Sequence, residues 1–214
     1  GEVVNTRNYP LIKPSKTEKK EDRAKLLLFI GTSMNSGKST SATACCWALT
    51  TMGYDVRASK VTGTASLKDI LHMQDAGASI VNDFTHCGFP STYLLAERGG
   101  VKIFNDLDLK YANNPKNYWA VELADGILQR ETALLLKSPD VRSRIHKLIF
   151  AAPDTFGAIG GLNVLKQEFG LVPDAISGVC SSSPLFLREL SEFTDIPVFN
   201  NIDCNLKQLS ELLI

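Results

Sequence analysis

The chain contains the segment Leu26-Leu27-Leu28-Phe29-Ile30-Gly31-Thr32-Ser33-Met34-Asn35-Ser36-Gly37-Lys38-Ser39-Thr40. An apolar run leads into a loop bounded by two glycines, and a pattern rich in Ala and Thr, typical of a helix, follows the lysine. A strand, a glycine-bounded loop and a helix N-terminus in this order present unpaired backbone amides and a positive dipole end to an anion. The segment therefore predicts a phosphate-binding site.

Residues of this loop are the candidate ligands of a nucleotide. Lys38 is expected at the β- and γ-phosphates as a catalytic residue, and the Ser39 hydroxyl is expected to ligate the Mg²⁺ that the phosphates bring. The predicted nucleotide-binding residues are Thr32, Met34, Asn35, Ser36, Gly37, Lys38, Ser39 and Thr40. ATP and Mg²⁺ are the expected cofactors.

The composition is that of an ordinary globular protein. The chain has 214 residues, 44% of them hydrophobic, and its 23 basic side chains balance 23 acidic ones. Without net charge it has no global field to hold nucleic acid or an anionic membrane, so an anionic ligand needs a local site. The apolar run Leu26–Ile30 is too short to cross a bilayer, and the sequence shows no signal peptide. We therefore expect a cytoplasmic protein without a nucleic-acid or membrane partner.

Short apolar runs alternate with helical patterns from Lys25 onward, which is typical of βα units around a parallel sheet. The sequence predicts strands near residues 25–31, 55–61, 118–123, 147–152, 175–180 and 196–200. It predicts helices over residues 37–52, 66–79, 91–98, 129–137, 140–146, 156–169, 184–193 and 205–213. We expect a three-layer α/β/α fold with a mostly parallel, doubly wound sheet.

Two regions differ in composition. Residues 25–214 form the expected nucleotide-binding domain. Residues 1–24 carry Pro10, Pro14 and a run of charges with little apolar periodicity. We expect them to be a linker or N-terminal extension, the end of a domain that this chain lacks.

The glycine-bounded loop departs from the usual P-loop spacing, because five residues rather than four separate its glycines. In this it resembles the G-T-x-x-x-x-G-K-S/T loop of dethiobiotin synthetase and its relatives in the signal-recognition/MinD/BioD class of P-loop NTPases. MinD- and ParA-like members carry a signature lysine where Ser33 stands here, which argues against a partitioning ATPase. The resemblance spans roughly Lys25 to Asn200 and implies a P-loop NTPase fold.

The same resemblance implies further site residues. Lys60 is similar to the synthetase lysine that helps to hold substrate and phosphate, so it is a candidate catalytic residue. Glu122 ends an apolar strand, as a Walker-B-like carboxylate does, and it matches the synthetase at this strand end. Asp75 is similar to a Mg²⁺-binding carboxylate of the synthetase. The expected metal ligands are therefore Ser39, Asp75 and Glu122, and Glu122 is also a candidate catalytic residue.

Asp83, Asp125 and Arg130 are candidate substrate-binding residues, and Asp83 is the alternative to Asp75 as a metal ligand. An exposed helical arginine explains Arg130 equally well. Residues 75–91 also resemble the D-A-x-x-x-D-F-x-x-G stretch of an uncharacterised P-loop family labelled NAD-dependent epimerase/dehydratase-like. Some members of that family are associated with amino-acid N-acylation. Among the histidines, His86 is the one to test, whereas His72 is expected to pack against the core.

Polar residues after the later strands leave other interpretations open. Asn200-Asn201-Ile202-Asp203 resembles the N-K-x-D guanine-reading element of GTPases, but Asn201 replaces its lysine and the segment follows the last expected strand. ATP is therefore favoured over GTP. Asp154 and Ser183 either bind substrate at the strand ends or cap helices.

The predicted function is ATP-dependent phosphoryl transfer to a small-molecule acceptor, a carboxylate or carbamate, by a ligase, synthetase or kinase. Lys38 and Lys60 would offset the developing charge. One alternative is a nucleotide-binding regulatory module in which occupancy orders the 75–91 loop and signals to an absent N-terminal domain. Another is an acyltransferase whose loop holds the phosphates of a donor such as acetyl-CoA. Because the resembled synthetase is a dimer, a homodimer is expected by analogy.

Overall fold

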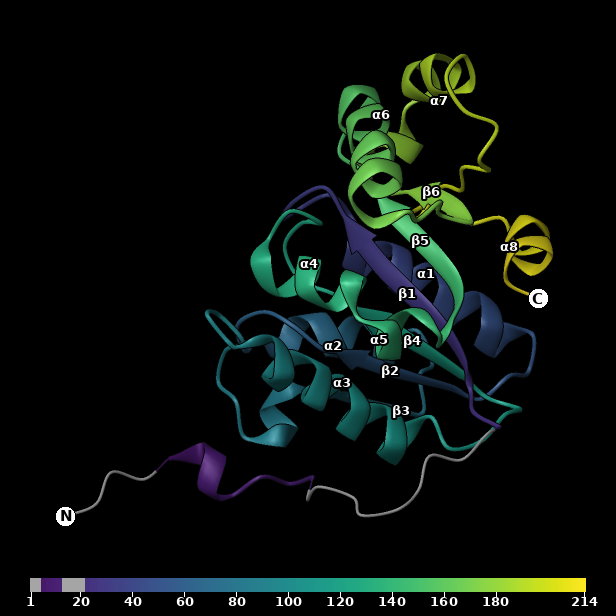
Figure 1. The fold of residues 1–214 in the computed structure, drawn as a ribbon. Helices are drawn as coiled ribbons and strands as arrows, with labels where there is room; N and C mark the ends of the chain where they lie inside the picture. Colours follow the sequence, from purple (N-terminus) through teal and green to yellow (C-terminus); the bar gives the residue numbers. More distant parts are fainter. Residues whose placement is uncertain (1–4, 13–21) are drawn as a thin grey trace.

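The computed structural model describes residues 5–12 and 22–214 (Figure 1). Within these residues six parallel strands form one sheet in the order β3-β2-β4-β1-β5-β6. The strands are β1 Lys25–Gly31, β2 Val56–Lys60, β3 Ile80–Asp83, β4 Tyr118–Glu122, β5 Ile145–Ala151 and β6 Ala175–Ser177. Because all strands run in the same direction, the loops after β1, β2 and β4 meet at one edge of the sheet.

Helices cover both faces of the sheet, which confirms the three-layer α/β/α fold (Figure 1). On one face lie α1 Lys38–Thr51, α2 Leu67–Asp75 and α8 Leu206–Leu213. On the other lie α3 Glu97–Tyr111, α4 Arg130–Lys137, α5 Pro139–Arg142, α6 Thr155–Val164 and α7 Pro184–Ser191. None of the helices in the described residues combines the length and the apolar character that a bilayer crossing requires.

Strand β1 shows why its sequence is a continuous apolar run. Leu26, Leu28 and Ile30 pack into the cluster under α3 to α7, and Leu27 and Phe29 pack into the cluster under α1, α2 and α8. Side chains of a strand alternate between faces, so a strand buried on both faces needs apolar residues at every position. The central strand and the loop that follows it therefore rest on two hydrophobic cores.

Two predicted elements were wrong, and one strand was missed. Strand β3 was not predicted, because it is four residues long and ends in the polar residues Asn82 and Asp83. The helix expected over 91–98 lies instead at 97–111, where Gly99 and Gly100 weaken the local helix signal. Residues 196–200 do not form a strand, and Val198 makes only an isolated bridge with Ile176.

The described part of the N-terminal region contacts the domain. Ile12 is buried, and its backbone amide donates to the carbonyl of His86 at 3.0 Å. Thr6 donates its hydroxyl to the carbonyl of Gly88 at 2.9 Å, and the Arg7 guanidinium lies over the Phe89 ring. Most of the predicted charge run lies outside the described residues, and the domain boundary near residue 24 stays a prediction.

Candidate functional site

The glycine-bounded loop joins β1 to α1, and Lys38 is the first residue of the helix. Its Nζ donates to the backbone carbonyls of Ser33 at 2.7 Å and of Asp125 at 2.6 Å. Burial lowers the pKa of the Lys38 ammonium, while the carboxylates of Glu122 and Asp125 oppose that shift. Lys38 thus joins the loop to the turn after β4 through neutral acceptors, which a charged phosphate oxygen can replace with a stronger bond.

Glu122 ends β4 beside the loop. Its Oε1 accepts a hydrogen bond from the Ser39 hydroxyl at 3.0 Å, whereas its buried Oε2 has no partner among the described residues. Burial raises the pKa of Glu122, and Lys60 and Lys38 oppose the rise. An orphaned carboxylate oxygen next to a hydroxyl is a donor set of hard oxygens, which Mg²⁺ prefers.

The protein alone does not complete a metal site. Residues 5–12 and 22–214 contain no group of three His, Cys, Asp or Glu side chains able to hold an ion. Mg²⁺ commonly keeps several waters and takes its remaining ligands from substrate phosphates. Ser39 and Glu122 therefore fit a magnesium ion that arrives with a nucleotide.

Lys60 lies on the other side of Glu122. It ends β2, pairs with Glu122 in the sheet register, and forms an ion pair with Asp69 from α2. Both lysines and Glu122 line a cavity of about 400 Å³. Its lining residues are Met34, Asn35, Gly37, Lys38, Ser39, Thr40, Lys60, Lys68, Asp69, His72, Glu122, Ala124, Asp125 and Val179. Phosphates would therefore meet one cation from the first residue of α1 and another from the end of β2.

The structure separates the remaining predicted residues. Asp125 lines the cavity, but Asp75 does not; it lines a neighbouring cavity at the end of α2. Asp83 caps the short helix at 84–87. The guanidinium of Arg130 is exposed and 3.9 Å from Glu131. Thus Ser39 and Glu122 come together, whereas Asp75 is not brought to them.

The other predicted loop residues differ in exposure. Met34 is exposed at the cavity, and Asn35 adopts a positive φ of 60°. The hydroxyls of Thr32 and Ser36 are buried without a partner in the part of the chain that is described. These hydroxyls, together with Thr40 in the cavity lining, keep the loop residues as candidate nucleotide contacts.

Sequence reasoning missed three features of the site. Asp69 is an acidic residue in the first turn of α2, where its charge is favourable to the helix dipole. That favourable interaction accounts for the residue without a role in a binding site. His72, expected to pack, is exposed at the rim of the cavity. Asn201 donates from Nδ2 to the carbonyl of Gly37 at 3.3 Å and to the Ser41 hydroxyl at 3.1 Å. Its late position in the sequence argued against a role, but the fold places it beside the glycine-bounded loop.

Two polar residues after later strands act as caps. Asp154 accepts from the amide of Gly157 at 2.6 Å, and Ser183 accepts from the amide of Phe186 at 3.5 Å. Each stands at the N-cap of its helix, α6 or α7. Helix capping accounts for both residues.

The Asp83–His86 pair predicts a pH-dependent contribution to stability. The hydrogen bond to Asp83 raises the pKa of His86, so its contribution is full below the ordinary value of 6.5 and is lost as pH rises through the folded value. Burial alone would raise the pKa of Asp83, but hydrogen bonds from His86 and Thr85 lower it below the ordinary value of 3.8. The contribution of Asp83 to stability is therefore present above pH 3.8 and is lost in stronger acid. We expect His86→Ala to lower the free energy of unfolding by up to about 1 kcal/mol, most strongly between these two pH values.

Chemical denaturation at mildly acidic and alkaline pH measures this effect. In the Asp83→Asn background the pH-dependent part of the His86→Ala effect should disappear. An effect of His86→Ala that is the same at both pH values, or that survives without Asp83, would contradict the pairing.

Comparisons with known proteins bear on the fold. No protein-family model matches the chain, and no curated protein sequence matches it. Several solved structures do match it. One is the signal recognition particle receptor FtsY from Elizabethkingia anophelis in complex with GDP. It aligns with a TM-score of 0.54 and 11% identity, over 94% of this chain and 64% of that chain. A second structure of this receptor gives a TM-score of 0.56 and 11% identity over 93% and 65%. FtsY from Mycoplasma mycoides gives 0.53 and 14% identity over 91% and 70%.

These likenesses define the class of fold. The chain has the three-layer α/β/α fold of P-loop NTPases, with a parallel sheet and the glycine-bounded loop between β1 and α1. It spans less than two thirds of the length of the two Elizabethkingia receptor chains. At 11% to 14% identity the likeness extends to the fold alone.

Proposed function

We propose that the chain binds a nucleoside triphosphate with Mg²⁺ at the loop of residues 31–40. The observation that carries the proposal is the convergence of Lys38, Ser39 and the unpartnered Oε2 of Glu122 in one cavity. The loop amides and the N-terminus of α1 would add donors for the phosphates. One neighbouring receptor structure is a complex with GDP, which supports a nucleotide as the ligand.

The reaction we propose is transfer of the γ-phosphoryl group to a small carboxylate or carbamate. An acceptor oxygen attacks the γ-phosphorus in line, the bond to the β–γ bridging oxygen breaks, and the nucleoside diphosphate leaves with that electron pair. Lys38 would hold the phosphates, and Lys60 and Lys68 in the same cavity would attract an anionic acceptor. Magnesium, when bound, offsets charge on the β- and γ-phosphates. The sequence favours ATP, and GTP is the alternative nucleotide.

Lys38→Ala is expected to weaken binding of the magnesium nucleotide by roughly 10- to 150-fold, the effect of losing a hydrogen bond to a charged group. Isothermal titration calorimetry with ATP and GTP in the presence of Mg²⁺ measures it. Lys110→Ala, at an exposed lysine on α3, is the matched control and should bind as the wild type does. No heat of binding for either nucleotide to the wild-type protein would refute the proposed function.

A second candidate function is a nucleotide-controlled switch, and one chain of contacts favours it. Thr92 bonds to Gly63 near Lys60, Thr64 bridges Ser91, and Thr6 bonds to Gly88. The site is thus continuous with the segment that holds residues 5–12. Phosphate release stimulated by a small acid identifies the transferase, and tight binding without turnover, with altered hydrogen exchange at residues 84–92, identifies the switch. Displacement of ATP by acetyl-CoA would instead indicate an acyltransferase.

A further inference from the structure

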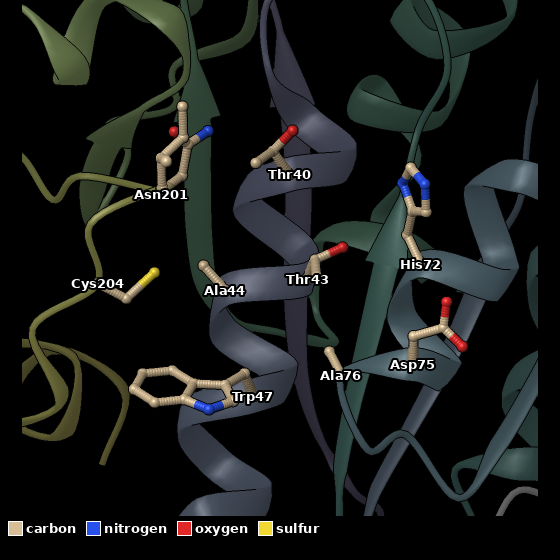
Figure 2. A pocket seen from close by; sticks show the side chains of 10 residues that line it. Thr40, Thr43, Ala44, Trp47, His72, Asp75, Ala76, Asn201 and Cys204 are labelled. Carbon is tan, nitrogen blue, oxygen red and sulfur yellow. The ribbon is translucent and has the colours of Figure 1, made fainter.

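A second cavity, of about 670 Å³, lies beside the phosphate loop along the outer side of α1 (Figure 2). The side chains from Thr40 to Trp47 form its floor. Residues 72–76, at the end of α2, form one wall, and residues 201–204 form the other. In Figure 2, Trp47 projects from α1 toward the segment that carries Cys204. The cavity is therefore a groove with an aromatic ring at the end away from the loop.

This groove adjoins the phosphate cavity. Thr40 and His72 line both of them. Thr40 follows Ser39, which we place at the metal and the phosphates. A ligand anchored by its phosphates can therefore extend along α1 into the groove.

The two cavities differ in charge. The phosphate cavity is lined by Lys38, Lys60 and Lys68, whereas the described residues lining the groove include neither lysine nor arginine. The groove carries one carboxylate, that of Asp75. An anionic acceptor would meet this carboxylate without a compensating cation. The groove thus suits an uncharged group with a flat apolar face and polar edges.

Two side chains are placed to hold such a group. Trp47 is 38% exposed, so its indole has surface free for stacking. Asn201 uses its Nδ2 to bond the loop, which orients the amide and leaves Oδ1 as an acceptor for a ligand. On the opposite wall, Asp75 can accept hydrogen bonds from hydroxyl groups. An aromatic face, an amide and a carboxylate match a base and a ribose.

We propose that the groove binds the nucleoside part of the nucleotide, with the base stacked on Trp47 and its edge donating to Oδ1 of Asn201. This inference rests on the proposed function, because the phosphates in the loop bring the nucleoside to the groove. It assigns Asp75 to the nucleoside, whereas the sequence suggested the metal.

The test separates the nucleoside from the phosphates. Calorimetry is carried out on the wild type, Trp47→Ala and Trp47→Phe, with ATP, GTP and inorganic tripolyphosphate, each with Mg²⁺. Trp47→Ala should lower affinity for the preferred nucleotide roughly 5- to 150-fold, the loss of one base–aromatic stack, and leave tripolyphosphate affinity unchanged. Trp47→Phe should retain most of the nucleotide affinity. Equal nucleotide affinity in all three proteins would overturn the proposal while leaving the phosphate site intact.

Alkylation of Cys204 gives a readout in the unmodified protein. Cys204 is partly exposed, whereas Cys45, Cys46, Cys87 and Cys180 are buried. Burial raises the pKa of the Cys204 thiol, so a maleimide is used at mildly alkaline pH. Nucleotide with Mg²⁺ should slow the labelling, and tripolyphosphate with Mg²⁺ should not. Equal protection by both ligands, or protection by neither when both bind, overturns the groove assignment; failure of both to bind overturns the proposed function as well.

Discussion

Gly178→Ala is expected to destabilise the protein by about 3 kcal/mol or more and to displace the glycine-bounded loop of residues 31–40. Gly178 has a φ of 101°, and a Cβ there would lie 2.3 Å from the carbonyl oxygen of Ser36 and 2.7 Å from that of Ala152. Gly37, in the loop, makes the reciprocal close approach, since a Cβ on it would lie 2.7 Å from the Cα of Gly178. The segment after β6 therefore supports the loop by direct backbone contact, which no side chain can enter.

Denaturant unfolding measures the loss of stability, and calorimetry with a magnesium nucleotide measures the effect on the loop. Gly53→Ala is the matched control, because Gly53 has a φ of 88° but no atom within 4 Å of its Cβ position. That control should show only the backbone strain, about 1–2 kcal/mol, and normal nucleotide binding. Equal losses in the two variants would show that the contact between Gly178 and the loop adds nothing.

Glu122→Gln is expected to raise the Mg²⁺ concentration for half-maximal nucleotide turnover by at least about 100-fold, because it removes a carboxylate proposed to hold the ion. The same change should raise stability at neutral pH. Burial raises the pKa of Glu122 above the ordinary value of 4.5, so ionisation costs more in the folded protein than in the unfolded chain. Glutamine removes that cost, so the gain in unfolding midpoint should grow as pH rises above 4.5 and vanish in stronger acid.

Phosphate release at varied Mg²⁺ concentration and thermal unfolding at several pH values measure the two effects. Asp75→Asn is the control for the metal, because Asp75 lines the groove and not the cavity with Glu122. At saturating nucleotide we expect it to leave the Mg²⁺ concentration for half-maximal activity unchanged, although it can lower nucleotide affinity through the groove. An equal shift in both variants would restore Asp75 as a metal ligand, and a stability loss in Glu122→Gln at neutral pH would contradict the electrostatic argument.

The local geometry of the proposed phosphate site was accessible from the sequence. Gly37, Lys38 and Ser39 are consecutive, so the short loop and the helix that follows it set their relative positions with little help from the rest of the chain. Glu122 was also predictable, because it follows a buried apolar strand and parallel strands end at the same edge of a sheet. The alternation of strands and helices likewise predicted the layers.

The residues that other segments of the chain bring to that site could be placed only from the tertiary structure. The order of strands across the sheet, which cannot be derived from the order along the chain, brings Lys60 beside Glu122, and α2 then supplies Asp69. The same packing sets Gly178 and Asn201 against the loop and turns Asp75 into the groove. A sequence motif determines the relative positions of residues that are adjacent in the chain. Contacts between segments far apart in the sequence form only when both hydrophobic cores pack around the sheet.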